Sequence, residues 1–74
     1  MAIDNEQGAL SAIEGWRKEP LRAQRKHLQE AADSLELGAM YYEQKGNEAG
    51  VTRVTRCLNL IRTRQQEIDF EITE

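Results

Sequence analysis

The sequence predicts an all-α fold built on a long antiparallel helical hairpin. In the last third of the chain, seven positions recur at spacings of three and four residues, and six of them are apolar. A heptad seam of this length is typical of a helix that lies against another helix. A glycine and an asparagine precede the seam and indicate a tight turn. The seam consists of Val51, Val54, Leu58, Ile61, Gln65, Ile68 and Ile72.

The size and composition fit one helical domain over residues 1–74. Helix formers are abundant, and aromatic residues make up only 5% of the chain. A compact chain of this length buries roughly 60% of the surface that its unfolded form exposes. Because an elongated hairpin buries less, we expect oligomerisation or partner binding to complete the bundle.

The first helix is predicted over about residues 5–18. Asp4 and Gln7 fit a capping box, in which each side chain bonds the backbone of the other residue. This short helix should pack at the base of the hairpin. Its apolar stripe is expected to be Leu10, Ile13 and Trp16.

Pro20 separates the first helix from the second, which is predicted over about residues 20–45. Proline disfavours helix in the preceding residue and suits the first turn of a new helix. We therefore expect the chain to turn at Pro20, with a kinked continuous helix as the alternative. The apolar seam of the second helix is Leu21, Leu28, Leu35 and Tyr42.

The third helix is predicted over about residues 48–70, with Gly46 ending the second helix and Asn47 capping the third. A connection of two or three residues forces an antiparallel return. The expected facing pairs are Tyr42 with Val51, Leu35 with Leu58, Leu28 with Gln65, and Leu21 with Ile72.

Charges are arranged to favour this register. At the base of the hairpin a basic stretch should lie beside an acidic end, and nearer the tip the signs are reversed. Each exposed pair contributes only about 0.2–1 kcal/mol, so the pattern selects the register more than it stabilises the fold. The acids at the base are Glu67, Asp69, Glu71 and Glu74. Nearer the tip, Glu30, Asp33, Glu36 and Glu43 oppose Arg53, Arg56, Arg62 and Arg64.

The basic stretch next to Trp16 is the only feature that suggests nucleic acid. The net charge of −3 argues against such a partner, and the acidic end offers compensating charges. We favour a solvated, paired face and keep a nucleic-acid-binding module as the alternative function. The candidate phosphate contacts are Arg17, Lys18, Arg22, Arg25 and Lys26.

The sequence holds no recognisable catalytic constellation. Cys57 has no histidine near it in the predicted register, so we expect a packed thiol rather than a nucleophile. His27 and Glu30 have the spacing of a helical metal site, but the chain offers no second histidine. We expect no enzyme activity, no cofactor and no metal.

Three features of the sequence bear on cellular location: its apolar stretches, its first residues and its single cysteine. No stretch approaches the roughly 18 apolar residues of a membrane span, and the first six residues lack the pattern of a signal peptide. The single cysteine permits no internal disulfide. We therefore expect a cytoplasmic protein without membrane contact.

Four apolar residues outside the two seams point to a partner surface near the tip. The short first helix should not reach them, and exposed apolar patches usually mark interaction sites. Self-association and a foreign protein partner both remain open. The four residues are Leu37, Met40, Tyr41 and Leu60.

Gln65 is the one polar member of the third seam. It either sits at the wet base of the hairpin, which we favour, or acts as a register determinant across a dimer axis.

Residues 37–46 resemble the first helix of a tetratricopeptide repeat, with a leucine–glycine pair, a tyrosine pair and a terminal glycine. The resemblance covers ten residues and implies close helix packing, without a second copy of the repeat. At the level of the fold alone, the chain is similar to small helical-hairpin co-chaperones of bacterial secretion systems and to small phage assembly proteins. That similarity implies a non-catalytic adaptor or assembly factor.

Overall fold

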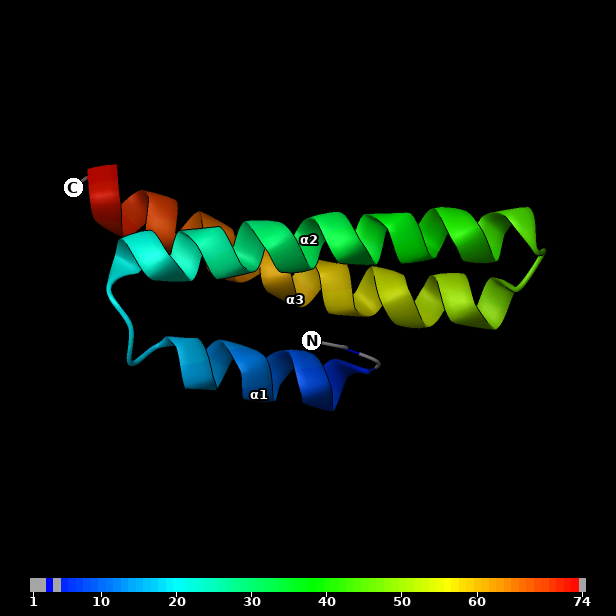
Figure 1. The fold of residues 1–74 in the computed structure, drawn as a ribbon, viewed down its shortest axis with the longest axis horizontal. Coiled ribbons are helices and arrows are strands. Elements are labelled where there is room, and N and C mark those ends of the chain that lie inside the picture. Colours follow the sequence, from blue (N-terminus) through cyan, green and yellow to red (C-terminus); the bar gives the residue numbers. More distant parts are fainter. Residues whose placement is uncertain (1–2, 4, 74) are drawn as a thin grey trace.

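The protein is an all-α molecule of three helices, as the sequence predicts (Figure 1). The computed structural model describes residue 3 and residues 5–73. The helices are α1 (Glu6–Trp16), α2 (Leu21–Gln44) and α3 (Glu48–Thr73). The molecule is elongated, with extents of 42 × 21 × 14 Å.

Helices α2 and α3 form the predicted antiparallel hairpin, joined at a short tip (Figure 1). Gly46 adopts a φ of +71°, a left-handed conformation that glycine adopts without a steric penalty. The Asn47 side chain accepts a hydrogen bond from the Gly50 backbone at 2.9 Å and caps α3. Helix α3 continues to Thr73, three residues beyond the predicted end.

Helix α1 folds back at Pro20, so the turn and not the kinked helix is correct. Pro20 is the N-cap of α2, with a ψ of 152° that is outside the helical range. The residue that caps α1 is Asn5, whose side chain accepts from the Gly8 backbone at 2.7 Å. The predicted cap, Asp4, lies outside the described residues. Helix α1 lies along the base half of the hairpin and packs more on α3 than on α2 (Figure 1).

The buried stripe of α1 differs from the predicted one. Ala9 and Ile13 are buried and Trp16 is half-buried, whereas Leu10 is 45% exposed. A spacing of three, repeated twice, drifts around a helix of 3.6 residues per turn. Ile13 and Trp16, four and seven residues after Ala9, stay on the same face of α1, and that face packs against the hairpin.

The most buried line of α3 is rotated from the predicted seam. Val51, Leu58 and Gln65 are only half-buried, and Ile72 is 47% exposed. Because α1 and α2 both contact α3, the deepest positions are those that point between the two neighbours. The buried residues of α3 after its first turn are Val54, Cys57, Ile61, Arg64 and Ile68.

Two ion pairs between α2 and α3, at different levels along the hairpin, confirm the predicted charge pairing. Arg25 lies 3.4 Å from Asp69 at the base, and Arg62 forms an ion pair with Glu36 further along. Arg64 is an exception, because its side chain is only 9% exposed and does not join the acids of α2. It pairs with Glu67 at 3.1 Å on its own helix. Since Arg64 sits on the deepest line of α3, it belongs to the interior.

Candidate interaction site

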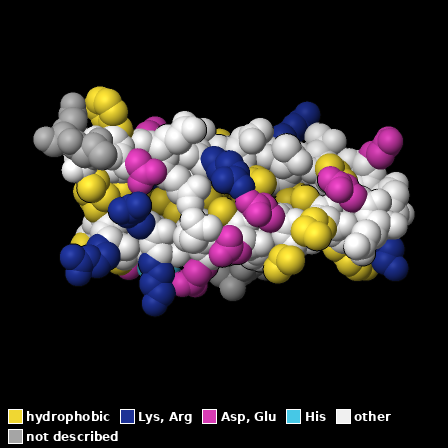
Figure 2. Space-filling view, turned by 90° about the horizontal axis from the view of Figure 1, so that it is seen from above, with side chains coloured by type: hydrophobic (Ala, Val, Ile, Leu, Met, Phe, Trp, Pro, Cys, Tyr) yellow, Lys and Arg dark blue, Asp and Glu magenta, His cyan; other side chains and the backbone are white. Residues whose placement is uncertain are grey.

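Three large apolar side chains share the outer face of α2. Leu37, Met40 and Tyr41 are 67%, 55% and 56% exposed, and their spacing of three and four residues places them side by side. We call these three residues the α2 patch. The buried residues of the same helix, such as Leu28 and Leu35, point the opposite way, into the hairpin. Figure 2 shows hydrophobic side chains exposed among charged ones on the tip half of the molecule.

Leu60, the fourth residue predicted for this surface, is half-buried and packs against the core. It stands one turn after Arg56, whose guanidinium approaches Glu6 of α1 to 3.9 Å. Leu60 therefore lies toward the side of α3 that faces α1. The α2 patch is accordingly formed by one helix alone.

Tyr41 is held in place by its neighbours. Its ring meets the Tyr42 ring edge-on at 5.7 Å, and the Lys45 ammonium lies 5.7 Å from its ring centre. Tyr42 is anchored in turn by Arg53, which donates a hydrogen bond to its hydroxyl at 3.3 Å. An aromatic ring held in this way offers contact area at a low entropic cost.

The basic segment is partly neutralised within the chain. Arg17 pairs with Glu14 at 2.9 Å and Arg25 with Asp69 at 3.4 Å. Lys18, Arg22 and Lys26 are exposed. These three make no ion pair with any described residue.

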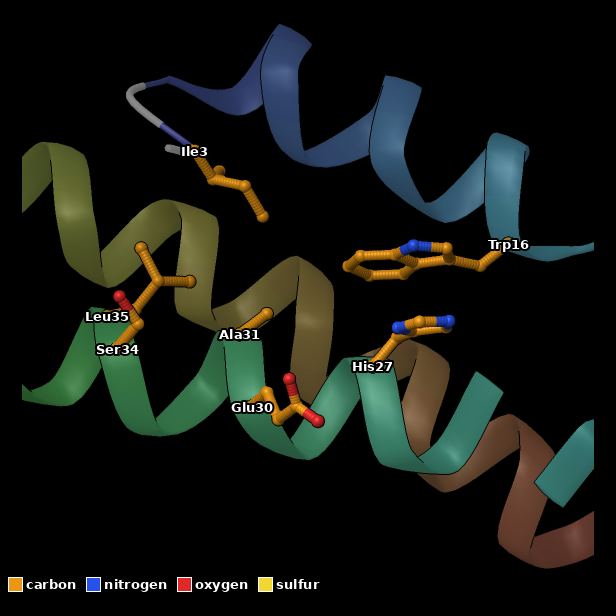
Figure 3. Close-up of a pocket in the computed structure, with 7 residues that line it drawn as sticks. All are labelled: Ile3, Trp16, His27, Glu30, Ala31, Ser34 and Leu35. Atoms are coloured by element: carbon orange, nitrogen blue, oxygen red, sulfur yellow. The ribbon is translucent and has the colours of Figure 1, made fainter. Parts of the chain in front are cut away.

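A groove of about 440 Å³ separates α1 from α2 (Figure 3). Trp16 and His27 stack at one end, with ring centres 5.3 Å apart and planes 11° from parallel, and Ile3 lies at the other end. The His27 Nε2 is 3.0 Å from a Glu19 carboxylate oxygen. His27 is therefore engaged with Glu19 and Trp16 rather than paired with Glu30. In the described part of the chain, no cluster of three potential metal ligands occurs.

Cys57 and Gln65 occupy contrasting places. The Cys57 side chain is fully buried, as expected for a packed thiol. Gln65 is half-buried and donates a hydrogen bond to the Gln29 side chain at 3.4 Å. The side chain that satisfies it is thus Gln29 rather than a residue opposite in the seam.

These features define a three-helix hairpin protein with an exposed apolar face on α2. Comparison with protein-family models, with curated proteins and with solved structures finds no match to this chain. Within the described residues, no helix is both long and apolar enough to cross a membrane.

Proposed function

We propose that the protein is a non-catalytic protein–protein interaction module, a small adaptor, assembly factor or co-chaperone-like protein of the cytoplasm. The observation that carries the proposal is the α2 patch, in which three large apolar side chains are each more than half exposed on one helix face. Single exposed apolar residues are ordinary, but a contiguous group marks a contact surface.

Helix packing is the mechanism that fits this surface. Residues spaced by three and four on a straight helix match an apolar stripe on another helix or in a groove. Tyr41 supplies the anchored aromatic contact, and Leu37 and Met40 supply aliphatic area beside it. Met40 is unbranched and adapts its shape to a partner.

Two observations support a non-catalytic role. The Cys57 thiol is fully buried, so a substrate has no access to it. The only histidine, His27, is occupied by Glu19 and Trp16. The alternative of nucleic-acid binding has less support, because Arg17 and Arg25 are already in ion pairs.

Photo-crosslinking from the α2 patch tests the proposal. A benzophenone amino acid replaces Met40, and a matched variant carries it at Gln66, which is exposed on α3. In extract of the native host, Met40 should give a discrete protein adduct and Gln66 should not. Equal background from both positions would show that the patch contacts no protein.

A further inference from the structure

We infer that the α2 patch binds a second copy of this chain, with the two α2 helices antiparallel. The inference rests on the proposed function and names the partner of the same surface. It is drawn from the polar and charged residues that continue the line of the patch toward both ends of α2.

The outer face of α2 carries a second heptad seam. Six exposed residues are spaced four, three, four, three and four apart, and their apolar members stand next to each other near the tip. A helix with such a face has a register for a second helix as well as for α3. The six residues are Lys26, Glu30, Asp33, Leu37, Met40 and Gln44.

One antiparallel register satisfies this seam. If the two-fold axis passes between Gly38 and Ala39, Leu37 of each copy meets Met40 of the other. Asp33 then faces Gln44, whose amide donates to the carboxylate. Shifting the register by one heptad would set Leu37 against Asp33 and Met40 against Glu30. That shift would bury carboxylates against apolar side chains, which is unfavourable.

Charged side chains that are unpaired within the described part of one copy lie beside the apolar centre, where they meet side chains of the opposite charge on the other copy. In this register, Glu30 of one copy approaches Lys45 of the other. Neither side chain makes an ion pair with a described residue of its own chain. Lys45 already leans over the Tyr41 ring, at the edge of the patch. Because a two-fold axis repeats each contact, the dimer gains every pair twice.

A second copy also accounts for the acidic and basic residues that flank the α2 patch. In an isologous pair the same surface is used by both chains, so both patches are covered and neither remains open. A foreign partner would need its own acidic and basic groups at matching heights. The α2 face supplies both signs itself.

Charge reversal combined with sedimentation equilibrium tests the inference. The wild-type chain should show the mass of a dimer. Glu30→Lys and Lys45→Glu should each weaken dimerisation about tenfold, because each places like charges opposite one another twice. The double variant Glu30→Lys/Lys45→Glu should return toward the wild-type dissociation constant. The matched control Lys18→Glu/Glu71→Lys exchanges exposed charges at the base of the molecule and should change nothing.

Circular dichroism of each variant checks that it is folded, so that a change in mass reports association. A wild-type chain that remains monomeric at millimolar concentration would overturn the inference. Photo-crosslinking from Met40 to a different protein would then leave the proposed function standing. A dimer in which the double variant is no better than either single variant would overturn the antiparallel register.

Discussion

Arg64 of α3 donates a hydrogen bond at 3.0 Å to the side-chain oxygen of Gln24 on α2. Both residues are buried, at 8% and 3% exposure. The Gln24 amide in turn donates at 2.8 Å to the backbone carbonyl of Glu19, in the turn after α1. The Nε of Arg64 has no hydrogen-bond partner in the described part of the chain. The two hydrogen bonds of Gln24 thus connect α3, α2 and the turn between α1 and α2.

Replacing Gln24 should destabilise the protein by about 2–3 kcal/mol. Gln24→Leu keeps the volume but leaves a buried charged donor without its acceptor, and it also removes the bond to Glu19. Urea unfolding followed by circular dichroism measures the change in free energy.

The companion variants Arg64→Met and Gln24→Leu/Arg64→Met separate charge from packing. Arg64→Met should cost about 1–3 kcal/mol, because it leaves the buried Gln24 side-chain oxygen without a donor. The double variant should be more stable than Gln24→Leu alone, because it removes the buried charge as well as its acceptor. If the double variant loses the sum of both single effects, the two side chains are not energetically coupled.

Gly50 should not tolerate a methyl group, although it lies within a helix. A Cβ at this position would stand 2.7 Å from Cγ of the Tyr42 ring. Gly50→Ala should therefore cost about 1–3 kcal/mol by overpacking the tip. The matched control is Gly15→Ala, where no heavy atom lies within 4 Å of the new Cβ apart from its chain neighbours and the surrounding backbone of α1.

Gly15→Ala should stabilise the chain by about 0.5–1 kcal/mol through helix propensity alone. Thermal unfolding compares the two variants directly. Equal shifts of the melting temperature in the same direction would contradict the close approach of α2 and α3 at Tyr42.

The sequence predicts those parts of the fold that depend on local chemistry or on two helices. Pro20 and Gly46 mark the turns, because proline restricts its neighbour and glycine accepts a positive φ. The ion pair of Arg25 with Asp69 follows from the antiparallel register. These features can be predicted without knowing where α1 packs.

The incorrect predictions concern the residues of the hairpin where α1 packs against it. A heptad pattern describes contact with one neighbour, so it does not show that α1 draws the buried line of α3 toward Arg64 and Cys57. An arginine in a helix is usually exposed, and nothing near Arg64 in the sequence indicates Gln24, forty residues earlier. Leu60 differs from its predicted exposed position for the same reason, since it packs against the core and is partly buried.

Nucleic acid should not bind through the basic segment at physiological salt. Two of its five cations are already paired, and the chain carries a net charge of −3. Filter binding with single- and double-stranded DNA at low salt should match an acidic control protein. Retention that falls steeply with salt and is lost in Arg22→Ala/Lys26→Ala would contradict this expectation, because phosphate contacts produce that dependence.

Truncating the α2 patch should weaken association without unfolding the chain. In Met40→Ala/Tyr41→Ala, both altered side chains are more than half exposed, so the free energy of unfolding should change by less than about 1 kcal/mol. Sedimentation should show a loss of complex, because truncation of an aromatic anchor in a contact surface typically costs about 2 kcal/mol or more of binding energy. Leu10→Ala is the matched control, since Leu10 is also exposed but lies on α1. Identical sedimentation of wild type and the double variant would exclude the patch as the self-association face.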